Sequence, residues 1–230
     1  MKKKANNLSI IIPCFNESKI IEQTIFKVSK WCSKNKLNFE ILIINNNSTD
    51  NTESIIQKFV SKSVLLLNEY QKGKGYAVKK GLVNAKYNNV LILDADLSTD
   101  ISHFDVQWLN SQNKLIVGSR PIGNEIGTPF VRKIYGYTLN FIIRKLFLIN
   151  LKDTQCGFKF LSSPNLIGLA EKIEIGGFMY DLNLILLCIE NDYEIIELPI
   201  IYKYNKNSSV SLLKDPIKMF LDLINLKKNF

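Results

Sequence analysis

The sequence contains one histidine, His103, and four cysteines with no C-x-x-C pair or other metal-ligand spacing. A single histidine excludes His-rich metal sites and any serine–histidine triad that uses a histidine other than His103. The cysteines are Cys14, Cys32, Cys156 and Cys188. Each falls in or near an apolar run, which predicts buried, reduced thiols and a cytoplasmic location.

Long apolar runs and linker sequences are also missing. No stretch reaches the roughly 18 uninterrupted apolar residues of a membrane span, and basic side chains interrupt the nearest candidate, residues 130–151. Residues 1–7 lead directly into an apolar run, so we expect no signal peptide. No Gly/Ser-rich or Pro-rich run divides the 230 residues, of which 46% are hydrophobic. We therefore expect a single domain over residues 1–230.

The excess of positive charge is not concentrated in one stripe. The formal net charge is +9, and the lysines are scattered apart from Lys2, Lys3 and Lys4. A nucleic-acid-binding protein usually gathers its basic residues on one surface, so we expect no nucleic-acid partner. Scattered positive charge suits an anionic substrate or an anionic membrane surface.

The common phosphate-binding loops are absent as well. Neither G-x-x-x-x-G-K-[ST] nor G-x-G-x-x-G occurs, so a nucleotide would be bound by other means.

Apolar runs alternate with helical patterns along the first half of the chain. Strands are expected at residues 8–14, 39–44, 63–67, 89–93, 115–118 and 193–201. Helices are expected at residues 17–34, 52–60, 75–85, 129–149, 178–190 and 216–226. This order predicts an α/β fold with a mostly parallel sheet and helices on both faces, followed by a helical C-terminal extension. Pro199 places the last strand near a sheet edge.

Two carboxylates, Asp94 and Asp96, directly follow the apolar run Val90-Leu-Ile-Leu. In an open α/β sheet, ligands bind at the carboxyl ends of the strands. Oxygen ligands in this position favour Mg²⁺ or Mn²⁺ held against a phosphorylated substrate. The alternative is a polar strand end that opens into a loop.

Polar and aromatic residues also follow the first two strands. Pro13, Phe15 and Glu17 could stack a base and bond a ribose, and the amides of Asn45 and Asn46 could bond a base edge. The alternative for the first strand is a simple strand end with Asn16 capping the next helix. For Asp50, capping of the helix that begins near Thr52 is the favoured interpretation.

The loop Lys72-Gly-Lys74-Gly75 has two interpretations. It is either an anion-binding loop, in which Lys74 contacts a phosphate, or a solvated turn.

These segments together resemble a known family. Ile11-Ile-Pro-Cys-Phe-Asn-Glu17, Asn46-Asn-Ser-Thr-Asp50, Gly73-Lys-Gly75 and Asp94-Ala-Asp96 resemble the nucleotide-sugar half of family 2 glycosyltransferases with the GT-A (Rossmann-like) fold. Gly118-Ser-Arg120, Arg132 and Asp153-Thr-Gln-Cys-Gly-Phe-Lys159 resemble dolichyl-phosphate glucosyltransferases and polyprenyl-phosphate mannose synthases. The resemblance covers about residues 8–226 and divides the domain into a nucleotide-sugar half, 8–119, and an acceptor half, 120–230.

The resemblance implies an inverting hexosyltransferase. Its donor would be a nucleotide sugar, with UDP-glucose the best candidate, and its acceptor a dolichyl-type polyprenyl phosphate. Asp94 and Asp96 would hold Mg²⁺ or Mn²⁺, and Ala95 would line the donor site with Asp94. Many members carry an Asp pair where this chain has Asn45 and Asn46, which leaves the preferred base open.

In the acceptor half the resemblance implies that Arg120, Arg132 and Lys159 bind the acceptor phosphate. Asp153 matches the acid proposed as catalytic base in relatives. We expect it to orient the acceptor or Lys159 at least as much as it takes up a proton. We also expect peripheral attachment to the cytoplasmic face of a membrane. Residues 130–151 and the C-terminal helix, with Met219, Phe220 and Leu223, are the candidate surfaces. Core packing is the alternative for about half of those side chains.

Two other functions remain open at this point. Asp94-Ala-Asp96-Leu-Ser-Thr99 comes within one residue of the D-x-D-x-T signature of haloacid dehalogenase phosphatases, in which the first Asp is the nucleophile. That signature usually sits on the first strand, and Thr99 is one position late. A non-catalytic module that binds a nucleotide sugar or a lipid is the third interpretation, and the intact acid pair argues against it.

Overall fold

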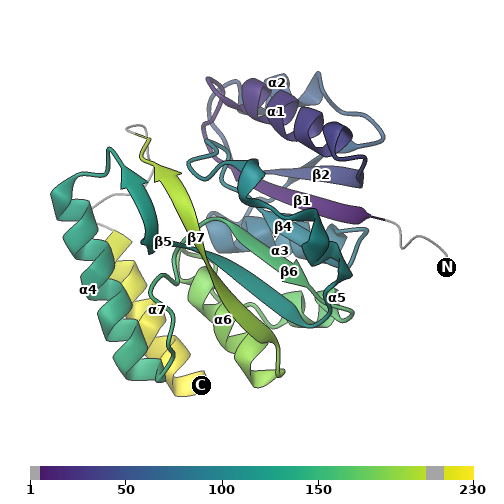
Figure 1. Cartoon of the computed structure of the whole chain (residues 1–230). Helices are drawn as coiled ribbons and strands as arrows, with labels where there is room; N and C mark the ends of the chain where they lie inside the picture. Colours follow the sequence, from purple (N-terminus) through teal and green to yellow (C-terminus); the bar gives the residue numbers. More distant parts are fainter. Residues whose placement is uncertain (1–5, 206–214) are drawn as a thin grey trace.

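The computed structural model describes residues 6–205 and 215–230, and its centre is one seven-stranded sheet (Figure 1). The strand order is β3-β2-β1-β4-β6-β5-β7. The strands are β1 (Asn7–Cys14), β2 (Asn38–Asn45), β3 (Val64–Asn68), β4 (Asn89–Ile92), β5 (Lys114–Ile126), β6 (Lys159–Ser162) and β7 (Glu194–Lys203). Strands from both halves of the chain therefore belong to the same sheet.

The sheet is mostly parallel, which confirms the expected fold class. The pairs β1–β2, β1–β4, β2–β3 and β5–β7 are parallel, and only β6 runs antiparallel to its neighbours β4 and β5. The sequence did not predict β6, because Lys159–Ser162 has a charged and a polar residue at its ends and lacks the continuous apolar run that marks β4. Strand β7 lies at one edge of the sheet, where Pro199 costs no ladder hydrogen bond on the outer side.

Helices cover both faces of the sheet (Figure 1). They are α1 (Ile21–Lys34), α2 (Thr52–Gln57), α3 (Lys74–Asn84), α4 (Phe130–Phe147), α5 (Leu166–Glu171), α6 (Tyr180–Glu190) and α7 (Asp215–Asn229). Helices α1 and α2 pack on one face, together with the short 3₁₀ turns η1 (Ile101–His103) and η2 (Val106–Asn110). Helices α3, α5 and α6 pack on the other face, with buried side chains from α4 and α7. None of the helices that the structure describes combines the length and apolar character needed to cross a bilayer.

Helix α1 begins later than the sequence predicted. It starts at Ile21 rather than at residue 17, and Asn16 does not cap it. Asn16 instead adopts a left-handed conformation, with φ of 58°, and its side chain accepts a hydrogen bond from Thr49 N at 2.7 Å. The residue therefore links two loops at the sheet edge, which a helix-cap rule cannot anticipate.

Helices α4 and α7 lie side by side at the β5–β7 end of the sheet and expose much of their apolar surface (Figure 1). On α7, Met219 and Leu223 are buried in the core, so the expectation that they face a membrane is wrong for these two side chains. Phe220 is 59% exposed. On α4 only Asn140 and Ile143 are buried.

Candidate active site

The loops after β1, β2 and β4 meet at the carboxyl edge of the sheet, because these three strands are parallel neighbours. Glu17 N donates to Thr52 Oγ1 at 2.8 Å, and Ser18 N donates to Asp50 Oδ2 at 3.2 Å. Asp50 Oδ1 also accepts from Thr52 N at 3.0 Å. Asp50 therefore bonds the first residue of α2 and at the same time fixes the loop after β1, although the N-cap position expected for it is occupied by Asn51.

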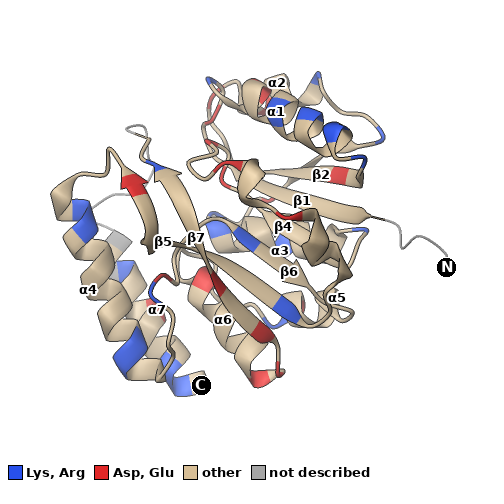
Figure 2. Ribbon diagram, viewed as in Figure 1, with Lys and Arg blue, Asp and Glu red and all other residues tan. Residues whose placement is uncertain are grey.

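Three acids gather at this edge, where Figure 2 shows acidic segments in the loops after β1, β2 and β4. Burial raises the pKa of Glu17 to about 7, with further contributions from the charges of Asp96 and Asp94. Asp96 accepts hydrogen bonds from Ser98 N at 2.9 Å and from Ser98 Oγ at 2.7 Å. The tight turn after Asp96 therefore orients its carboxylate. Mutual repulsion in this cluster favours a bound cation.

Asp94 is held from two sides. Lys74, the first residue of α3, forms an ion pair with Asp94 Oδ1 at 2.5 Å. A Cβ atom on Gly157 would lie 1.9 Å from Asp94 Oδ2, so only glycine fits at this position. Burial alone would raise the pKa of Asp94, but Lys74, Lys159 and Arg120 outweigh it and the net effect is a lowered pKa. Asp94 is therefore ionised at neutral pH.

The acid pair fits a divalent cation that arrives with a diphosphate. Among residues 6–205 and 215–230, no three His, Cys, Asp or Glu side chains are grouped so that they could share a metal ion. Asp94 and Asp96 offer only hard oxygen donors. Mg²⁺ and similar ions commonly bind through one or two carboxylates, with phosphate oxygens and water as the remaining ligands. The donor set therefore matches Mg²⁺ or Mn²⁺ with substrate, and not a metal centre built from protein alone.

Asn45 and Asn46 do not lie as expected for residues that bond a base edge. Both are buried. Asn45 Nδ2 donates to Asn68 Oδ1 at 3.0 Å, and Asn45 Oδ1 accepts from Ser48 N at 3.2 Å. Asn46 Nδ2 donates to the carbonyls of Glu69 and Gln71, and its Oδ1 accepts from Gly73 N at 2.8 Å. These amides are used to hold loops, including the glycine–lysine loop, and leave no free edge for a base.

The other predicted donor residues lie around the same edge. Phe15 is half-buried, and Lys72 Nζ lies 5.4 Å from the centre of its ring. Pro13, the residue before the end of β1, lies opposite β2 in the sheet and directs the chain toward Phe15 and Glu17. Ala95 is buried, and its carbonyl accepts a hydrogen bond from Thr24 Oγ1 of α1 at 2.6 Å. Burial would lower the pKa of Lys74, but the charges of Asp94 and Asp181 outweigh it and raise the pKa.

Asp153 and Arg120 form a two-point ion pair beside the acids. Arg120 Nε donates to Asp153 Oδ2 at 2.6 Å, and Arg120 Nη2 donates to Asp153 Oδ1 at 2.9 Å. Burial would raise the pKa of Asp153, but Arg120 and backbone N–H groups lower it strongly. Glu197 Oε1 accepts from the backbone N–H groups of Lys152 and Asp153, which fixes the loop. Both carboxylate oxygens of Asp153 are thus engaged by Arg120, and not by Lys159.

Lys159 is enclosed within the protein. Its side chain is fully buried, forms an ion pair with Asp181 and donates to the carbonyl of Cys156. The expectation of direct contact between Lys159 and an acceptor phosphate does not match this placement, because the ammonium has no exposed surface. Its neighbour Cys156, like the other three cysteines, is a free buried thiol, as predicted.

Arg132 lies in the first turn of α4, and its guanidinium carbon is 5.4 Å from the ring centre of Tyr204. The same helix face turns toward the Asp153–Lys159 loop, because Asn140 Oδ1 accepts from Thr154 N and Thr154 Oγ1, both at 2.9 Å. A Cβ atom on Gly136 would meet no atom within 4 Å. The helix surface one turn beyond Arg132 is therefore open.

Sequence reasoning missed three residues of this site. Arg120 stacks on Tyr202, with 5.4 Å between the guanidinium carbon and the ring centre. Tyr204 supports Arg132 in the same way, and Asp181 neutralises Lys159. The pattern Tyr202-Lys-Tyr204 at the end of a strand was a usable signal, since residues at i and i+2 share one face of a strand.

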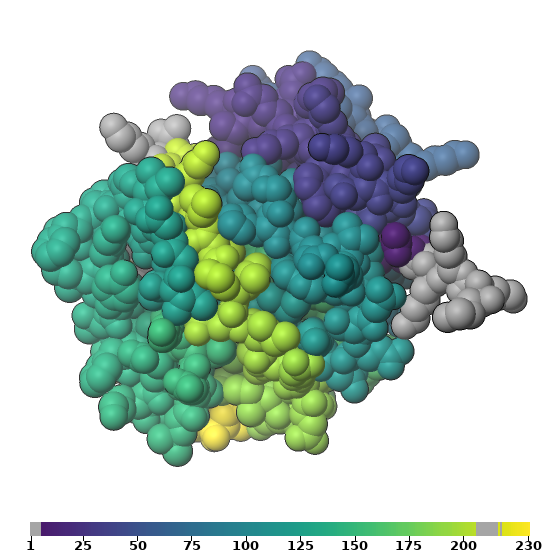
Figure 3. All heavy atoms as spheres, in the orientation of Figure 1, coloured from purple at the N-terminus to yellow at the C-terminus, as the bar shows by residue number. Residues whose placement is uncertain are grey.

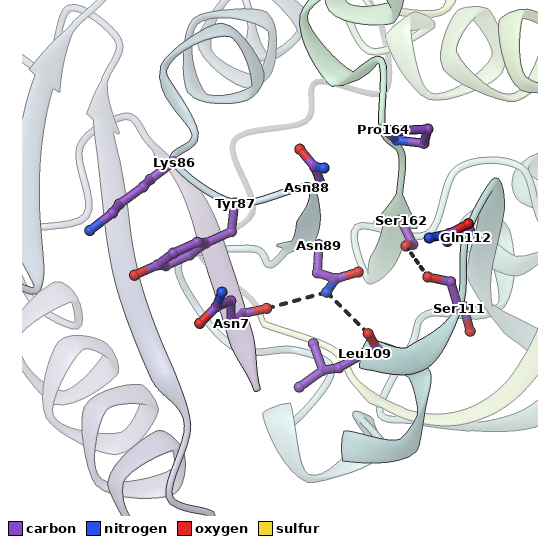
Figure 4. Close-up of a pocket in the computed structure, with 10 residues that line it drawn as sticks. All are labelled: Asn7, Lys86, Tyr87, Asn88, Asn89, Leu109, Ser111, Gln112, Ser162 and Pro164. Atoms are coloured by element: carbon purple, nitrogen blue, oxygen red, sulfur yellow. Dashed lines mark hydrogen bonds between the residues drawn. The ribbon is translucent and has the colours of Figure 1, made fainter. Parts of the chain in front are cut away.

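A separate pocket lies at the other end of the strands, beside the first residues of β1 and β4 (Figure 4). Its volume is about 380 Å³, and amide and hydroxyl side chains line most of it. Asn89 Nδ2 crosses it toward the carbonyls of Asn7 and Leu109. None of the candidate site residues lines this pocket, so it takes no part in the arrangement described above.

Comparison with known proteins gives a consistent result. The family model for glycosyl transferase family 2 matches residues 9–166. The chain is 27% identical over 95% of its length to a dolichyl-phosphate beta-glucosyltransferase, ALG5D, of Trichomonas vaginalis, and covers 72% of that protein. It is 28% identical over 96% of its length to the dolichyl-phosphate beta-glucosyltransferase of Saccharomyces cerevisiae and covers 74% of it.

Solved structures share the fold at lower identity. Glucosyl-3-phosphoglycerate synthase of Mycobacterium tuberculosis, in complex with Mn²⁺, UDP and phosphoglyceric acid, superposes with a TM-score of 0.70 at 16% identity. The match covers 95% of this chain and 76% of that one. Mannosyl-3-phosphoglycerate synthase of Rubrobacter xylanophilus gives a TM-score of 0.65 at 16% identity, covering 96% and 73% of the two chains.

Proposed function

Because the chain belongs to glycosyl transferase family 2, we propose that it transfers glucose from UDP-glucose to a dolichyl-type polyprenyl phosphate. The observation that carries the proposal is the closeness of an acid pair and an arginine. Arg120 lies near enough to Asp94 to help lower the pKa of that carboxyl. An anionic site that suits a cation and diphosphate therefore adjoins a cationic site that suits a second phosphate.

The acceptor needs orientation more than it needs a base. A phosphate monoester has a second pKa near 6 and is largely dianionic at neutral pH. Its oxygen attacks the anomeric carbon as the bond from that carbon to UDP breaks, which inverts the configuration. Arg120 and Arg132 attract the dianion and hold it beside another anion, because guanidinium presents a planar fork to phosphate.

Asp153 then acts as a positioning residue. Its carboxylate is buried, ionised and bonded at both oxygens by Arg120, so it presents no free oxygen to an acceptor. It fixes the direction of the Arg120 fork and leaves the remaining N–H groups of that side chain for the acceptor phosphate.

Asp94 and Asp96 are the residues that hold Mg²⁺ or Mn²⁺ in this proposal. When bound, the ion neutralises charge on the diphosphate leaving group. Asp96 is oriented by Ser98, and Lys74 adds a positive charge next to Asp94. Phe15 and Glu17 remain the proposed contacts for base and ribose. The family match, and the position of Asp94 after β4 and not after the first strand, favour a metal ligand over a phosphatase nucleophile.

A transfer assay tests the proposal. Purified protein is incubated with Mn²⁺, a polyprenyl phosphate and labelled UDP-glucose, UDP-galactose or GDP-mannose, and lipid-linked sugar is extracted and measured. We expect transfer from UDP-glucose that is lost on adding a chelator and recovered with Mg²⁺ or Mn²⁺. Transfer to water or to phosphoglyceric acid, with none to polyprenyl phosphate, would contradict the proposed acceptor.

We further propose that α4 and α7 dock the protein on an anionic membrane surface. Most of the exposed large apolar side chains in the described residues lie on or beside these two helices, among them Phe130, Tyr137, Phe141, Phe220 and Leu221. Helix α4 carries lysine and arginine but no acid (Figure 2). A helix with apolar and basic side chains suits the interface of a bilayer that contains anionic lipid.

Vesicle sedimentation tests this surface. We expect the protein to bind phosphatidylcholine vesicles that contain phosphatidylglycerol. Phe141→Ser combined with Leu221→Ser should weaken binding about tenfold, since each change removes apolar area from the interface. Ile167→Ser on α5, 52% exposed and outside the α4–α7 surface, is the matched control and should bind like wild type. Equal losses in both variants would contradict the assignment.

A further inference from the structure

Both arginines of the acceptor side rest on tyrosine rings from the end of β7. The guanidinium carbon of Arg120 lies 5.4 Å from the centre of Tyr202, and that of Arg132 lies 5.4 Å from the centre of Tyr204. These distances are within the range of cation–π attraction. Arg120 belongs to β5 and Arg132 to α4, so one short segment supports cations from two different elements.

The two rings are held on the same side of an extended chain. Tyr202 lies within β7, and Tyr204 N donates to the carbonyl of Ile126 on β5 at 2.9 Å, so the extended pairing continues past the end of the strand. Residues at i and i+2 of a strand point to one face and are roughly 6–7 Å apart. This spacing suits two guanidinium groups that bracket a single phosphate.

The charge arrangement explains why aromatic partners are used. Asp153 already neutralises Arg120. A ring face attracts a cation and leaves its charge in place, whereas an acid in the same position would neutralise it. Aromatic support therefore fixes the direction of two long side chains without weakening their attraction for an anion.

The same segment is tied to the donor side. Lys203 N donates to the carbonyl of Ser98 at 2.7 Å, and Thr99 forms an isolated bridge with Tyr202. Ile201 N donates to His103 Nε2 at 3.1 Å. In Figure 3 the atoms of β7 form a yellow-green band with teal atoms on both sides. Since Ser98 also orients Asp96, the tyrosines are at a fixed place relative to the acid pair.

We propose that Tyr202 and Tyr204 are positioning residues of the acceptor site, whose rings hold Arg120 and Arg132 as a paired clamp for the phosphate group. This inference rests on the proposed function, since it takes the phosphate to be that of the polyprenyl acceptor. In this proposal the two rings act through the arginines that rest on them.

The test compares leucine and phenylalanine variants at each position. Tyr202→Leu and Tyr204→Leu remove the ring, while Tyr202→Phe and Tyr204→Phe keep it. We expect each leucine variant to raise the KM for polyprenyl phosphate about five- to tenfold, with the KM for UDP-glucose within twofold of wild type. The phenylalanine variants should stay within twofold for both substrates. Ile196→Ala on the same strand is the control.

A second measurement does not depend on turnover. In protein labelled with ¹⁵N-arginine, the side-chain N–H signals are followed by NMR during titration with citronellyl phosphate. In wild type we expect Arg120 and Arg132 to respond at the same ligand concentration. In Tyr202→Leu the shared response should move to a concentration about five- to tenfold higher.

The outcomes separate the inference from the proposed function. Wild-type protein that binds citronellyl phosphate at both arginines but transfers no sugar would overturn the proposed function and support the clamp. Leucine and phenylalanine variants that behave alike, or equal rises in both KM values, would overturn the clamp while leaving the transferase assignment in place. Arginine signals that ignore the phosphate in wild type would also overturn the clamp.

Discussion

The donor side and the acceptor side of this sheet edge are built in different ways. On the donor side, short polar side chains such as Asn46 and Asp50 bond the backbone of neighbouring loops, and the loops are thereby fixed. On the acceptor side, long charged side chains are fixed by buried ion pairs and ring faces, as Arg120 is by Asp153 and Tyr202. The donor side therefore resists single changes through many weak bonds. The acceptor side depends on a few strong ones.

The largest expected loss of activity comes from a change on the donor side, although many hydrogen bonds fix its loops. The reason is that one carboxylate there, Asp96, is proposed to hold the metal ion of the donor. Asp96→Ala should lower transfer about a hundred- to a thousandfold, since loss of one key electrostatic group commonly costs that much. The fold should be intact, because the hydrogen bonds of Asp96 within residues 6–205 and 215–230 are to its own turn. Activity and circular dichroism are measured on the same preparation. Near wild-type turnover with Mn²⁺ present would exclude the metal role.

On the acceptor side, Asp153→Asn should damage both stability and acceptor use. The change leaves Arg120 without its charge partner, and breaking a buried ion pair typically costs about 3–5 kcal/mol. We expect a loss of about 3 kcal/mol in urea unfolding and about a hundredfold rise in the KM for polyprenyl phosphate. The double variant with Arg120→Met should be more stable than Asp153→Asn alone. A variant that kept acceptor KM but lost kcat would favour a role as base instead.

Arg132→Ala tests the acceptor side at a partly exposed arginine in the first turn of α4. A charge-assisted hydrogen bond to phosphate contributes about 1.5–3 kcal/mol, so acceptor use should weaken roughly ten- to a hundredfold. The affinity for UDP-glucose, measured by calorimetry without lipid, should stay unchanged. Arg132→Lys should recover only part of the loss, because a point charge does not replace the planar fork. Loss of UDP-glucose binding with normal acceptor binding would place the acceptor site elsewhere.

The smallest expected effect concerns Glu17 and the pH dependence of stability. Burial, with Asp96 and Asp94, raises its pKa to about 7 from an ordinary value of 4.5. The folded state then binds a proton that the unfolded state has lost, so stability falls as pH rises from about 4.5 to 7. The full shift would correspond to roughly 3 kcal/mol, and solvent screening of this half-exposed group reduces the expected effect to about 1 kcal/mol. Glu17→Gln removes this loss, so its free energy of unfolding in urea at pH 8 should be about 1 kcal/mol higher than that of wild type. The two proteins should converge near pH 4.5, and a constant difference across pH would contradict the argument.

The sequence predicted the donor half of the fold well, for a physical reason. Strands β1, β2, β3 and β4 are long apolar runs between helical segments, and in such an order parallel pairing follows. It did not predict β6, whose residues Lys159–Ser162 are held by two neighbours that are distant in the chain. Antiparallel insertion of this strand depends on tertiary contacts and leaves no local pattern.

For the candidate site, residue identities were easier to predict than their partners. The acid pair could be found because carboxylates directly after a buried apolar strand are costly unless they bind a partner. The arginines could be found because the segments around them resemble a known family. The roles of Asn46, Asp153 and Lys159 could not, because an amide, a carboxylate or an ammonium serves equally well to bind a ligand or to hold a loop. Only the contacts of each side chain separate the two uses.

The close approach of Gly157 to Asp94 has a consequence for protein engineering. Gly157 precedes β6, and β6 lies between β4 and β5, so a residue of the acceptor motif forms one wall of the donor site. A chimera that joins the first 119 residues of one relative to the remainder of another would therefore take the residue that packs against Asp94 from the acceptor half of the second relative. Any such exchange must keep glycine at this position, or the grafted half will displace the carboxylate on which the recipient half depends.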